Sequence, residues 1–431
     1  MRIRIPDREQ TAFLEILSDH LHGRRSRRQE LDWRKLWQYA FTHQVSAIIY
    51  DQCAEWMGQK ELFEEAYHAA TYQSLQYRFL DGRLRQKFSE AGIEVFTVKG
   101  LAVADCYPKP LLRTMGDLDL VTNRRKEAGE VLSLLGFALK PELRDDWEWH
   151  YRKDGLLVEL HDMLLYQSDE ISDCQRDFFN HYQPFLNQGK LEWNFHFLYL
   201  ICHMYRHFLK SGVGFRHFMD LAAVILTVRL DENWLSEQLK KLGMYRFTLT
   251  VLSLIEIWFD VPSPLRKETD TAFGHAAGEA AESSSEDVEV RDKTAIWGRN
   301  DDSEEDRGVR LLSEDFVKRA TLKIFRDGLF GLENKENDDN EITLSAARGK
   351  LPPSILLALR VVKTVFLPYS RLQHLKGFEF LKGRPYLLPA AWVRRLVLRL
   401  VYGDAARFMS RAFPEKEAIE ERKRQLDEWG L

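Results

Sequence analysis

Apolar residues recur at helical spacing through the first 90 residues of the chain. Members of such a series that are three or four positions apart lie on one face of a helix. One series is Phe13, Ile16, Leu17 and Leu21, and another is Leu31, Trp33, Leu36, Trp37 and Ala40. A charged stretch without proline runs from residue 61 to about 89, and Ala91-Gly92 ends it. The pattern predicts a helical region over residues 1–90.

The pattern changes at residue 93, where a short β-branched and apolar run begins. Residues 93–98 (IEVFTV) are typical of a buried strand. Lys99-Gly100 follows at once and precedes a predicted short helix over 101–106. Glycine lets the backbone approach a phosphate group closely, and a helix N-terminus favours anions. This turn is therefore a candidate phosphate-binding element.

Two aspartates alternate with apolar residues in the next run, Gly116-Asp117-Leu118-Asp119-Leu120-Val121. Such alternation is the period of a strand with two different faces. Asp117 and Asp119 would project to one side of that strand, about 7 Å apart. Acids are poor strand formers, so their presence in a strand points to a function. Two carboxylates this close suit Mg²⁺, which binds carboxylates, water and substrate phosphates.

A β-hairpin is predicted further along the chain, because alternating segments over 147–152 and 156–161 flank a Lys-Asp-Gly turn. In the second segment Glu159 and His161 share one face, while apolar neighbours take the other. If this strand pairs beside the strand of the two aspartates, Glu159 can reach the same metal ions. It would act there as a third carboxylate ligand or as a general base.

Helical spacing returns at Phe195, and after a segment of different composition it resumes at Leu311. Residues 274–308 contain eleven acids against four bases and few apolar residues, which is typical of a disordered insertion or linker. The predicted organisation is a helical region over 1–90, an α/β core over 91–190, a helical domain over 191–273, the acidic insertion over 274–308 and a C-terminal helical region over 309–431.

Composition narrows the class of protein only a little. The chain has 431 residues, 45% of them hydrophobic, which supports packed cores in two or three domains. Its 66 acids nearly balance 62 bases, so net charge neither requires nor excludes a nucleic-acid partner. The four cysteines form no Cys-X-X-Cys pair, and neither an apolar leader nor a membrane-length apolar run is evident. We therefore expect a cytoplasmic protein without a membrane anchor.

These segments together resemble the uncharacterised nucleotidyltransferase family of the polymerase-beta-type superfold. The resemblance is clearest in VFTVKGLAVADCYPKPLLRTMGDLDLV (95–121), where strand, Lys-Gly turn, short helix, Tyr-Pro, Arg and the Asp-Leu-Asp run follow in order. Further similar segments are DWRKLWQYAFTHQVSAIIYDQ (32–52), LLVELHDML (156–164), HMYRHFLKSGVGFRHFMDLA (203–222) and FLPYSRLQHLKGFEFLKGRPYLLPAAWVRRLV (366–397). The resemblance thus covers most of the chain outside the acidic segment.

The resemblance implies an α+β fold in which a small mixed β-sheet, the nucleotidyltransferase core, is embedded in a mainly helical protein. It places Gly100 at the nucleotide turn and makes Asp117, Asp119 and Glu159 a metal-binding and catalytic triad. The implied cofactor is Mg²⁺ or Mn²⁺, and the implied substrate is an NTP. An acceptor hydroxyl would attack the α-phosphate and release pyrophosphate.

The chain departs from the superfold at the nucleotide turn. That turn usually contains Gly-Ser or Gly-Gly, whereas here the sequence is Lys99-Gly100-Leu101. The missing serine hydroxyl removes one phosphate contact. We expect Lys99 or Arg113 to compensate by charge, since arginine suits bidentate contact with phosphate.

The acceptor is open at this stage. A protein side chain or a small metabolite or sugar is favoured over an RNA end, because no basic stripe with interleaved aromatic residues is evident. One alternative is a non-catalytic nucleotide-binding or interaction protein that retains the fold. Another is a glycosyltransferase that uses its Asp-X-Asp with a nucleotide-sugar. It would need a longer βαβ unit than the roughly 25 residues present before the aspartates.

Two further pairs lie at the i, i+4 spacing of a helix. His203 and His207 share a face and could bind a metal ion. No third ligand is evident at a fitting distance, so packing or hydrogen-bonding roles are expected for them. Arg216 and Asp220 most simply form an ion pair on one helix. A position lining the nucleotide cleft is the alternative.

Overall fold

The computed structural model describes most of the chain. The described residues are 7–26, 30–58, 60–140, 148–166, 170–187, 189–210, 212–265 and 312–328, with parts of 366–394 and the C-terminal 416–431. The acidic segment over 274–308 lies outside them, so the expectation for that segment stays a prediction. The predicted core over 91–190 is described apart from 141–147, 167–169 and 188.

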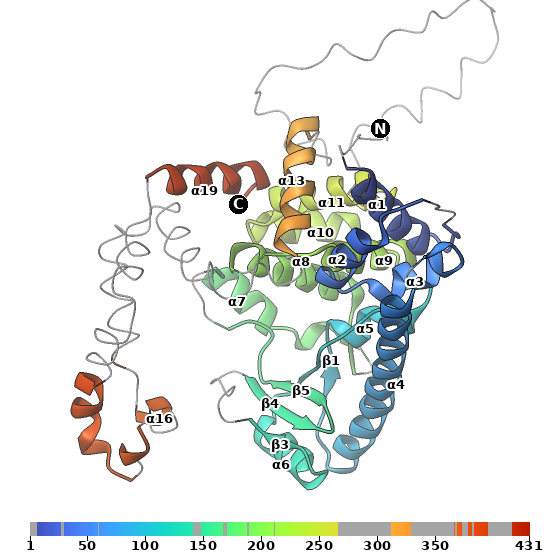
Figure 1. Ribbon diagram of the computed structural model, residues 1–431. Coiled ribbons are helices and arrows are strands. Elements are labelled where there is room, and N and C mark those ends of the chain that lie inside the picture. Colours follow the sequence, from blue (N-terminus) through green and yellow to red (C-terminus); the bar gives the residue numbers. More distant parts are fainter. Residues whose placement is uncertain are drawn as a thin grey trace, which may run out of the picture.

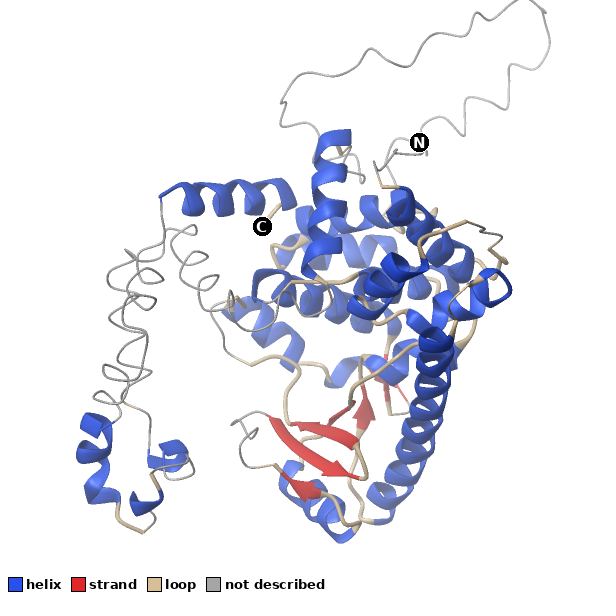
Figure 2. Ribbon diagram, in the orientation of Figure 1, coloured by secondary structure: helices blue, strands red, loops and turns tan. Residues whose placement is uncertain are grey.

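Helices form most of the described structure, as the apolar spacing predicts (Figure 2). They are α1 (Arg8–Leu21), α2 (Trp33–Thr42), α3 (Ser46–Cys53), α4 (Glu61–Glu90), α5 (Gly100–Ala104), α6 (Arg125–Leu134), α7 (Asp173–Asn180), α8 (Trp193–Lys210), α9 (Phe215–Thr227), α10 (Glu232–Lys241), α11 (Tyr245–Phe259), α13 (Glu314–Asp327), α16 (Tyr369–Leu372) and α19 (Lys416–Trp429). Side chains that accept hydrogen bonds from backbone N–H groups of the first turn cap five of them: Asp7, Asp32, Ser172, Asp231 and Ser313. No described helix has the length and apolar character needed to cross a membrane.

A mixed sheet of five strands lies at one end of the helical body (Figure 1). Its strands are β1 (Phe96–Thr97), β2 (Leu118–Val121), β3 (Ala138–Leu139), β4 (Glu148–Lys153) and β5 (Leu156–His161), and a separate pair comprises β6 (Leu186–Asn187) and β7 (Lys190–Leu191). The order in the sheet is β1-β2-β5-β4-β3. β1 is antiparallel to β2, whereas β2 runs parallel to β5. The predicted α+β fold, with a small mixed sheet in a mainly helical protein, is confirmed.

The predicted hairpin is formed by β4 and β5, which pair antiparallel from Glu148 opposite His161 to Lys153 opposite Leu156. The chain turns at Asp154 and Gly155, whose φ angles are +48° and +82°. A two-residue hairpin loop with positive φ at both positions matches the right-handed twist of the strands, and Asp-Gly adopts it readily. The local sequence therefore determines this hairpin and its register.

Apolar packing gives the sheet two different faces. Leu118, Leu120, Val158 and Leu160 alternate along β2 and β5 and pack in one cluster with residues of α4 and α6. Because side chains alternate along a strand, the residues between these leucines and valine face the other way. A larger cluster joins the N-terminal helices to α8, α9, α11 and α13. The polar face of the sheet therefore looks toward this helical body (Figure 1).

The buried His20 of α1 should make the stability of the fold depend on pH. Its side chain is only 1% exposed, and burial lowers its pKa to about 4. In the unfolded chain the pKa of histidine is about 6.5. Between about pH 6.5 and 4 the unfolded state therefore binds a proton at this histidine, whereas the folded state does not. The stability from His20 is therefore present above about pH 6.5 and is lost as the pH falls toward 4.

We expect His20→Leu to lose less stability than the wild type when the pH is lowered from about 7 to about 5. Urea unfolding followed by tryptophan fluorescence at both pH values measures the difference. His68→Leu, at an exposed position of α4, is the matched control and should follow the wild type. Equal losses in all three proteins would contradict the assignment.

Candidate active site

A cavity of about 300 Å³ lies between the polar face of the sheet and helices α8 and α9. Its carboxylates are Asp117, Asp119, Glu148, Glu159 and Asp220; its cations are Lys99, Arg113, Arg206 and Arg216; its histidines are His161, His203, His207 and His217. The six residues that the sequence suggests for the site, Lys99, Gly100, Arg113, Asp117, Asp119 and Glu159, all line this cavity. They are brought together by β2, β5 and the segment between β1 and β2.

The parallel pairing of β2 with β5 sets acidic residues of two strands side by side. Asp119 lies opposite Glu159 in the register, and Val121 lies opposite His161. Ligand atoms of Asp119, Glu159 and His161 all lie within 4.8 Å of one another. Asp117 comes one residue before β2 and lines the same cavity. The strand pairing that Glu159 needs in order to join the aspartates is therefore present.

The buried carboxylates of this group do not ionise at their ordinary pKa. Burial, together with the charges of Asp119 and Asp117, raises the pKa of Glu159 to about 8. Burial and the charge of Asp119 also raise the pKa of Asp117. Burial alone would raise the pKa of Asp119 as well, but Lys99 and His161 hold it below its ordinary value. Clustered oxygen donors of this kind fit Mg²⁺ or Mn²⁺, because a bound cation stabilises their charged forms.

Lys99 supplies positive charge directly to Asp119, since its Nζ lies 2.6 Å from Oδ1 of that carboxylate. The backbone of Lys99 has φ +55° and ψ −126°, a region that disfavours a residue with a side chain. Such strain costs on the order of 1–3 kcal/mol and persists where the surroundings enforce it. Here the ion pair enforces it together with the backbone N–H, which donates to Nε2 of His196 at 3.2 Å.

Gly100 leaves room for the guanidinium of Arg113, because a Cβ atom at position 100 would lie 3.2 Å from its Nη1. Arg113 is buried and donates from Nε and Nη2 to the two carboxylate oxygens of Asp220, at 3.0 and 2.7 Å. Tyr107 donates to the same carboxylate at 2.7 Å. The predicted ion pair of Arg216 with Asp220 is therefore wrong. The packing of α9 turns Asp220 toward a partner 107 positions away instead of along its own helix.

Arg216 of α9 lines the cavity. A position lining the nucleotide cleft was the alternative to the ion pair in the sequence analysis. Nη1 of Arg216 donates to the backbone oxygen of Thr114 at 3.0 Å and to Oε1 of Gln44. Its Nε is buried and has no hydrogen-bond partner within the described part of the chain. Burial, with the charge of Arg113, lowers the pKa of Arg216 to about 10, so it is still a cation at neutral pH. A buried cation with an unused donor is suited to an anionic ligand.

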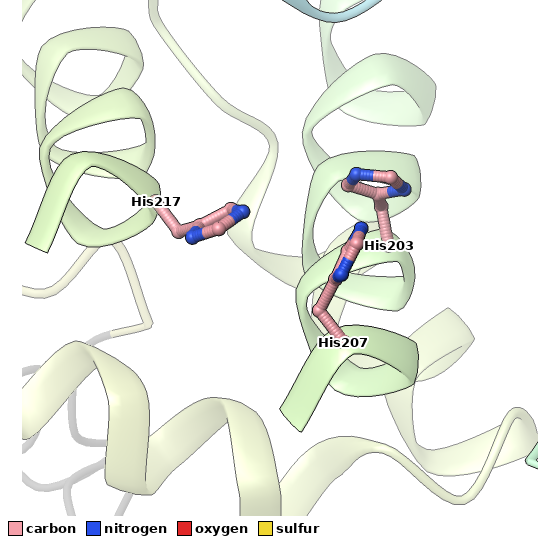
Figure 3. Close-up of side chains that lie close together, drawn as sticks. All are labelled: His203, His207 and His217. Carbon is pink, nitrogen blue, oxygen red and sulfur yellow. The ribbon is translucent and has the colours of Figure 1, made fainter. Parts of the chain in front are cut away.

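Among the cavity residues that the sequence pattern did not single out are Glu148, Arg206 and His217. Glu148 begins β4 opposite His161, and the hairpin prediction contained the signal, because directly opposed residues of a hairpin share a face. His217 of α9 forms a group with His203 and His207 of α8, and their ligand atoms lie within 4.8 Å of one another (Figure 3). The spacing of histidines along the chain hinted at this group. The packing of α9 against α8 is what brings the third ring to the other two.

The sheet, the acidic strands and the cavity together define the class of protein expected from the resemblance, an enzyme that transfers nucleotidyl groups. A family model described as an uncharacterised nucleotidyltransferase matches residues 29–260, more than half of the chain. The protein belongs to this family, and its enzymatic class is nucleotidyltransferase. The matched range runs from before α2 to the end of α11 and contains every residue of the cavity. No curated protein and no solved structure matches the chain.

Proposed function

We propose that the protein is a Mg²⁺- or Mn²⁺-dependent nucleotidyltransferase that moves an NMP group from an NTP to a hydroxyl acceptor and releases pyrophosphate. The register of Asp119 opposite Glu159 across two parallel strands carries the proposal, with Asp117 in the same cavity. These three carboxylates would hold the cation. When bound, the cation supplies charge neutralisation at the phosphate oxygens.

Glu159 is the proposed acceptor of the hydroxyl proton. Burial and the neighbouring aspartates raise the pKa of Glu159, and the cation would counter this by stabilising the carboxylate form that can take up the proton. As the proton leaves, the acceptor oxygen forms a bond to the α-phosphorus. The bond from that phosphorus to the pyrophosphate oxygen breaks, and the electron pair leaves with pyrophosphate. His161, whose Nε2 lies 3.2 Å from Oδ1 of Asp119, helps to hold that carboxylate in place.

The nucleotide is proposed to lie along the turn at Lys99 and Gly100. Gly100 allows close approach of the phosphates. The ammonium group of Lys99, which contacts Asp119, can turn to contact a phosphate oxygen instead. Arg113 contributes its charge from beside Gly100, while Asp220 fixes its orientation. We add Arg216 to the proposed phosphate-binding residues, because its Nε has no hydrogen-bond partner among the described residues and can donate to an anion.

For the acceptor we favour a protein side chain or a small metabolite or sugar over an RNA end. A cavity of about 300 Å³ is at the small end of ligand sites. It fits the reacting part of a nucleotide with a single side chain or a small molecule. This supports the preference drawn from the absence of a basic and aromatic stripe in the sequence.

Incubation of the purified chain with α-labelled NTPs and Mg²⁺ or Mn²⁺ tests the proposal. Label should pass to a protein or small-molecule acceptor with release of pyrophosphate, and a chelator should abolish the transfer. With γ-labelled NTP the label should appear in pyrophosphate and not in the acceptor, which separates nucleotidyl transfer from phosphoryl transfer. Nucleotide binding without transfer of label to protein, RNA or small molecules would favour the alternative, a non-catalytic nucleotide-binding protein.

A further inference from the structure

Three imidazole rings converge on the α8 and α9 side of the cavity (Figure 3). His203 and His207 lie one turn apart on α8, with ring centroids 4.4 Å apart. His217 points toward them from α9, its ring centroid 5.6 Å from that of His207. One nitrogen from each ring lies within 4.8 Å of the other two.

We propose that His203, His207 and His217 form a second metal site, which takes a Zn²⁺-class ion and is distinct from the carboxylate site. Imidazole nitrogen is a preferred ligand of zinc and the later transition metals, whereas Mg²⁺ prefers oxygen. Three histidines leave a fourth coordination position for water or a substrate atom. The site therefore differs from the carboxylate group in its donor atoms. It also differs in position, because its ligands come from α8 and α9, whereas the carboxylates come from β2 and β5 and the residues just before β2.

The spacing of the rings is compatible with coordination. With Zn–N distances of about 2.0–2.1 Å, three nitrogens of a tetrahedral site lie about 3.4 Å apart. The nitrogens of the three rings lie within 4.8 Å of one another, so each separation differs from that value by at most about 1.4 Å. Two of the three ligands are one turn apart on one helix, an arrangement that many zinc sites use.

The surroundings favour neutral rings, the form that coordinates a metal. Burial lowers the pKa of His203 and His207 well below the ordinary value, and that of His217 to about 4. The backbone N–H of Gly214 donates to Nδ1 of His217 at 3.3 Å, which leaves Nε2 as the nitrogen for a metal. Coordination there moves the ring proton to Nδ1, and this long hydrogen bond is given up.

Neighbouring cations shape what the fourth position would hold. The carboxylate of Asp220 acts on His217 with the opposite sign, but it is itself paired with Arg113. The positive charges of Lys99 and Arg206 act on His203 and His207, and those of Arg216 and Arg113 act on His217. These charges oppose a bare dication and favour one whose remaining ligand is an anion. We therefore assign an anionic oxygen, such as that of a phosphate or a carboxylate, to the open position. That this anion belongs to a substrate rests on the proposed function; the metal site itself does not.

Zinc titration of the chelator-stripped, full-length protein tests the proposal, with X-ray absorption fine structure to count the ligands. We expect one tightly bound ion with three imidazole ligands at about 2.0–2.1 Å. A single imidazole with carboxylate oxygens would instead place the ion at Asp119, Glu159 and His161, and would overturn the proposal. Failure to bind one equivalent of zinc would overturn it equally.

Substitutions separate the two sites independently of turnover. His207→Gln and His217→Gln should each weaken zinc binding by about 100-fold or more, beyond the roughly 10–100-fold typical of second-shell changes. Glu159→Gln and the exposed-site control His68→Gln should bind zinc as the wild type does. Circular dichroism verifies that each variant is folded, and the ligand count on the wild type decides the matter if one is not. Loss of zinc binding in Glu159→Gln with retention in His207→Gln contradicts the proposal, and it leaves the nucleotidyl-transfer proposal standing.

Discussion

Asp119→Asn is expected to lower the rate of nucleotidyl transfer by at least about 10³-fold, the larger end of losses caused by removing one transition-state charge contact. Asp119 is the carboxylate beside which Lys99, His161 and Glu159 lie. It lies opposite Glu159, receives Lys99 at 2.6 Å and faces His161 at 3.2 Å. An amide keeps the shape but removes the charge that would hold the cation. Transfer of label from an α-labelled NTP, measured over a range of Mg²⁺ concentrations, gives the loss.

Asp162→Asn is the matched control for this prediction. Asp162 directly follows β5 and pairs with Arg125 at 3.1 Å, and it is not among the residues that line the cavity. Its substitution should leave transfer within a few-fold of the wild type. Thermal unfolding of both variants shows whether lost activity reflects lost structure. Undiminished transfer by a folded Asp119→Asn protein would remove the carboxylate from the catalytic site.

The central pair of strands was predictable because its information is local. The alternation of acids and leucines from Asp117 to Leu120 determines which side chains pack in the apolar cluster, and a one-residue shift would place the acids there. The Asp-Gly turn likewise fixes the register of β4 on β5. Given these two facts, the meeting of Asp119 with Glu159 still required β2 and β5 to be neighbours in a matching register, and the structure has them so.

The partners of the charged groups were not predictable in the same way. Helical spacing suggested Arg216 for Asp220, yet the carboxylate pairs with Arg113, because α9 packs against α5 and Arg113 lies in the segment that follows α5. An i, i+4 pair on a helix surface stabilises by only a few tenths of a kcal/mol, roughly 0.2–0.5, so a buried bidentate contact overrides it. His217, the third histidine of the cluster, was not predicted for a related reason. The direction in which His217 points depends on how two helices pack, and no periodicity along the chain records that.

Lys99 shows a different limit of sequence reasoning. Its charge was expected to meet phosphate, whereas its Nζ contacts Asp119 in this structure. The two roles are compatible, because an ion pair that holds the carboxylate can yield to a cation and a triphosphate arriving together. The positive φ of Lys99 belongs to the same arrangement, since it directs the side chain toward β2. A strained conformation of this kind depends on the folded surroundings and leaves no pattern in the sequence.

Asp220→Ala is expected to destabilise the fold by about 3–5 kcal/mol, because it leaves the buried guanidinium of Arg113 without its charge partner. Asp220 and Arg113 are almost fully buried and joined by two hydrogen bonds, and Tyr107 would lose its acceptor as well. Urea unfolding measured by tryptophan fluorescence gives the change in free energy. Asp173→Ala is the matched control, since that aspartate makes an exposed ion pair with Arg176 and should change stability little.

A second variant separates an uncompensated charge from lost packing around Asp220. Removing both charges, in Arg113→Met/Asp220→Leu, should restore much of the stability, because apolar residues of similar size replace a buried pair without leaving a charge behind. Recovery will be incomplete to the extent that the hydroxyl of Tyr107 loses its acceptor. If the double variant is as unstable as Asp220→Ala, packing and not charge is what Asp220 provides. If it is stable yet no longer transfers label, Arg113 acts on the nucleotide as well as on the fold, as its position beside Gly100 suggests.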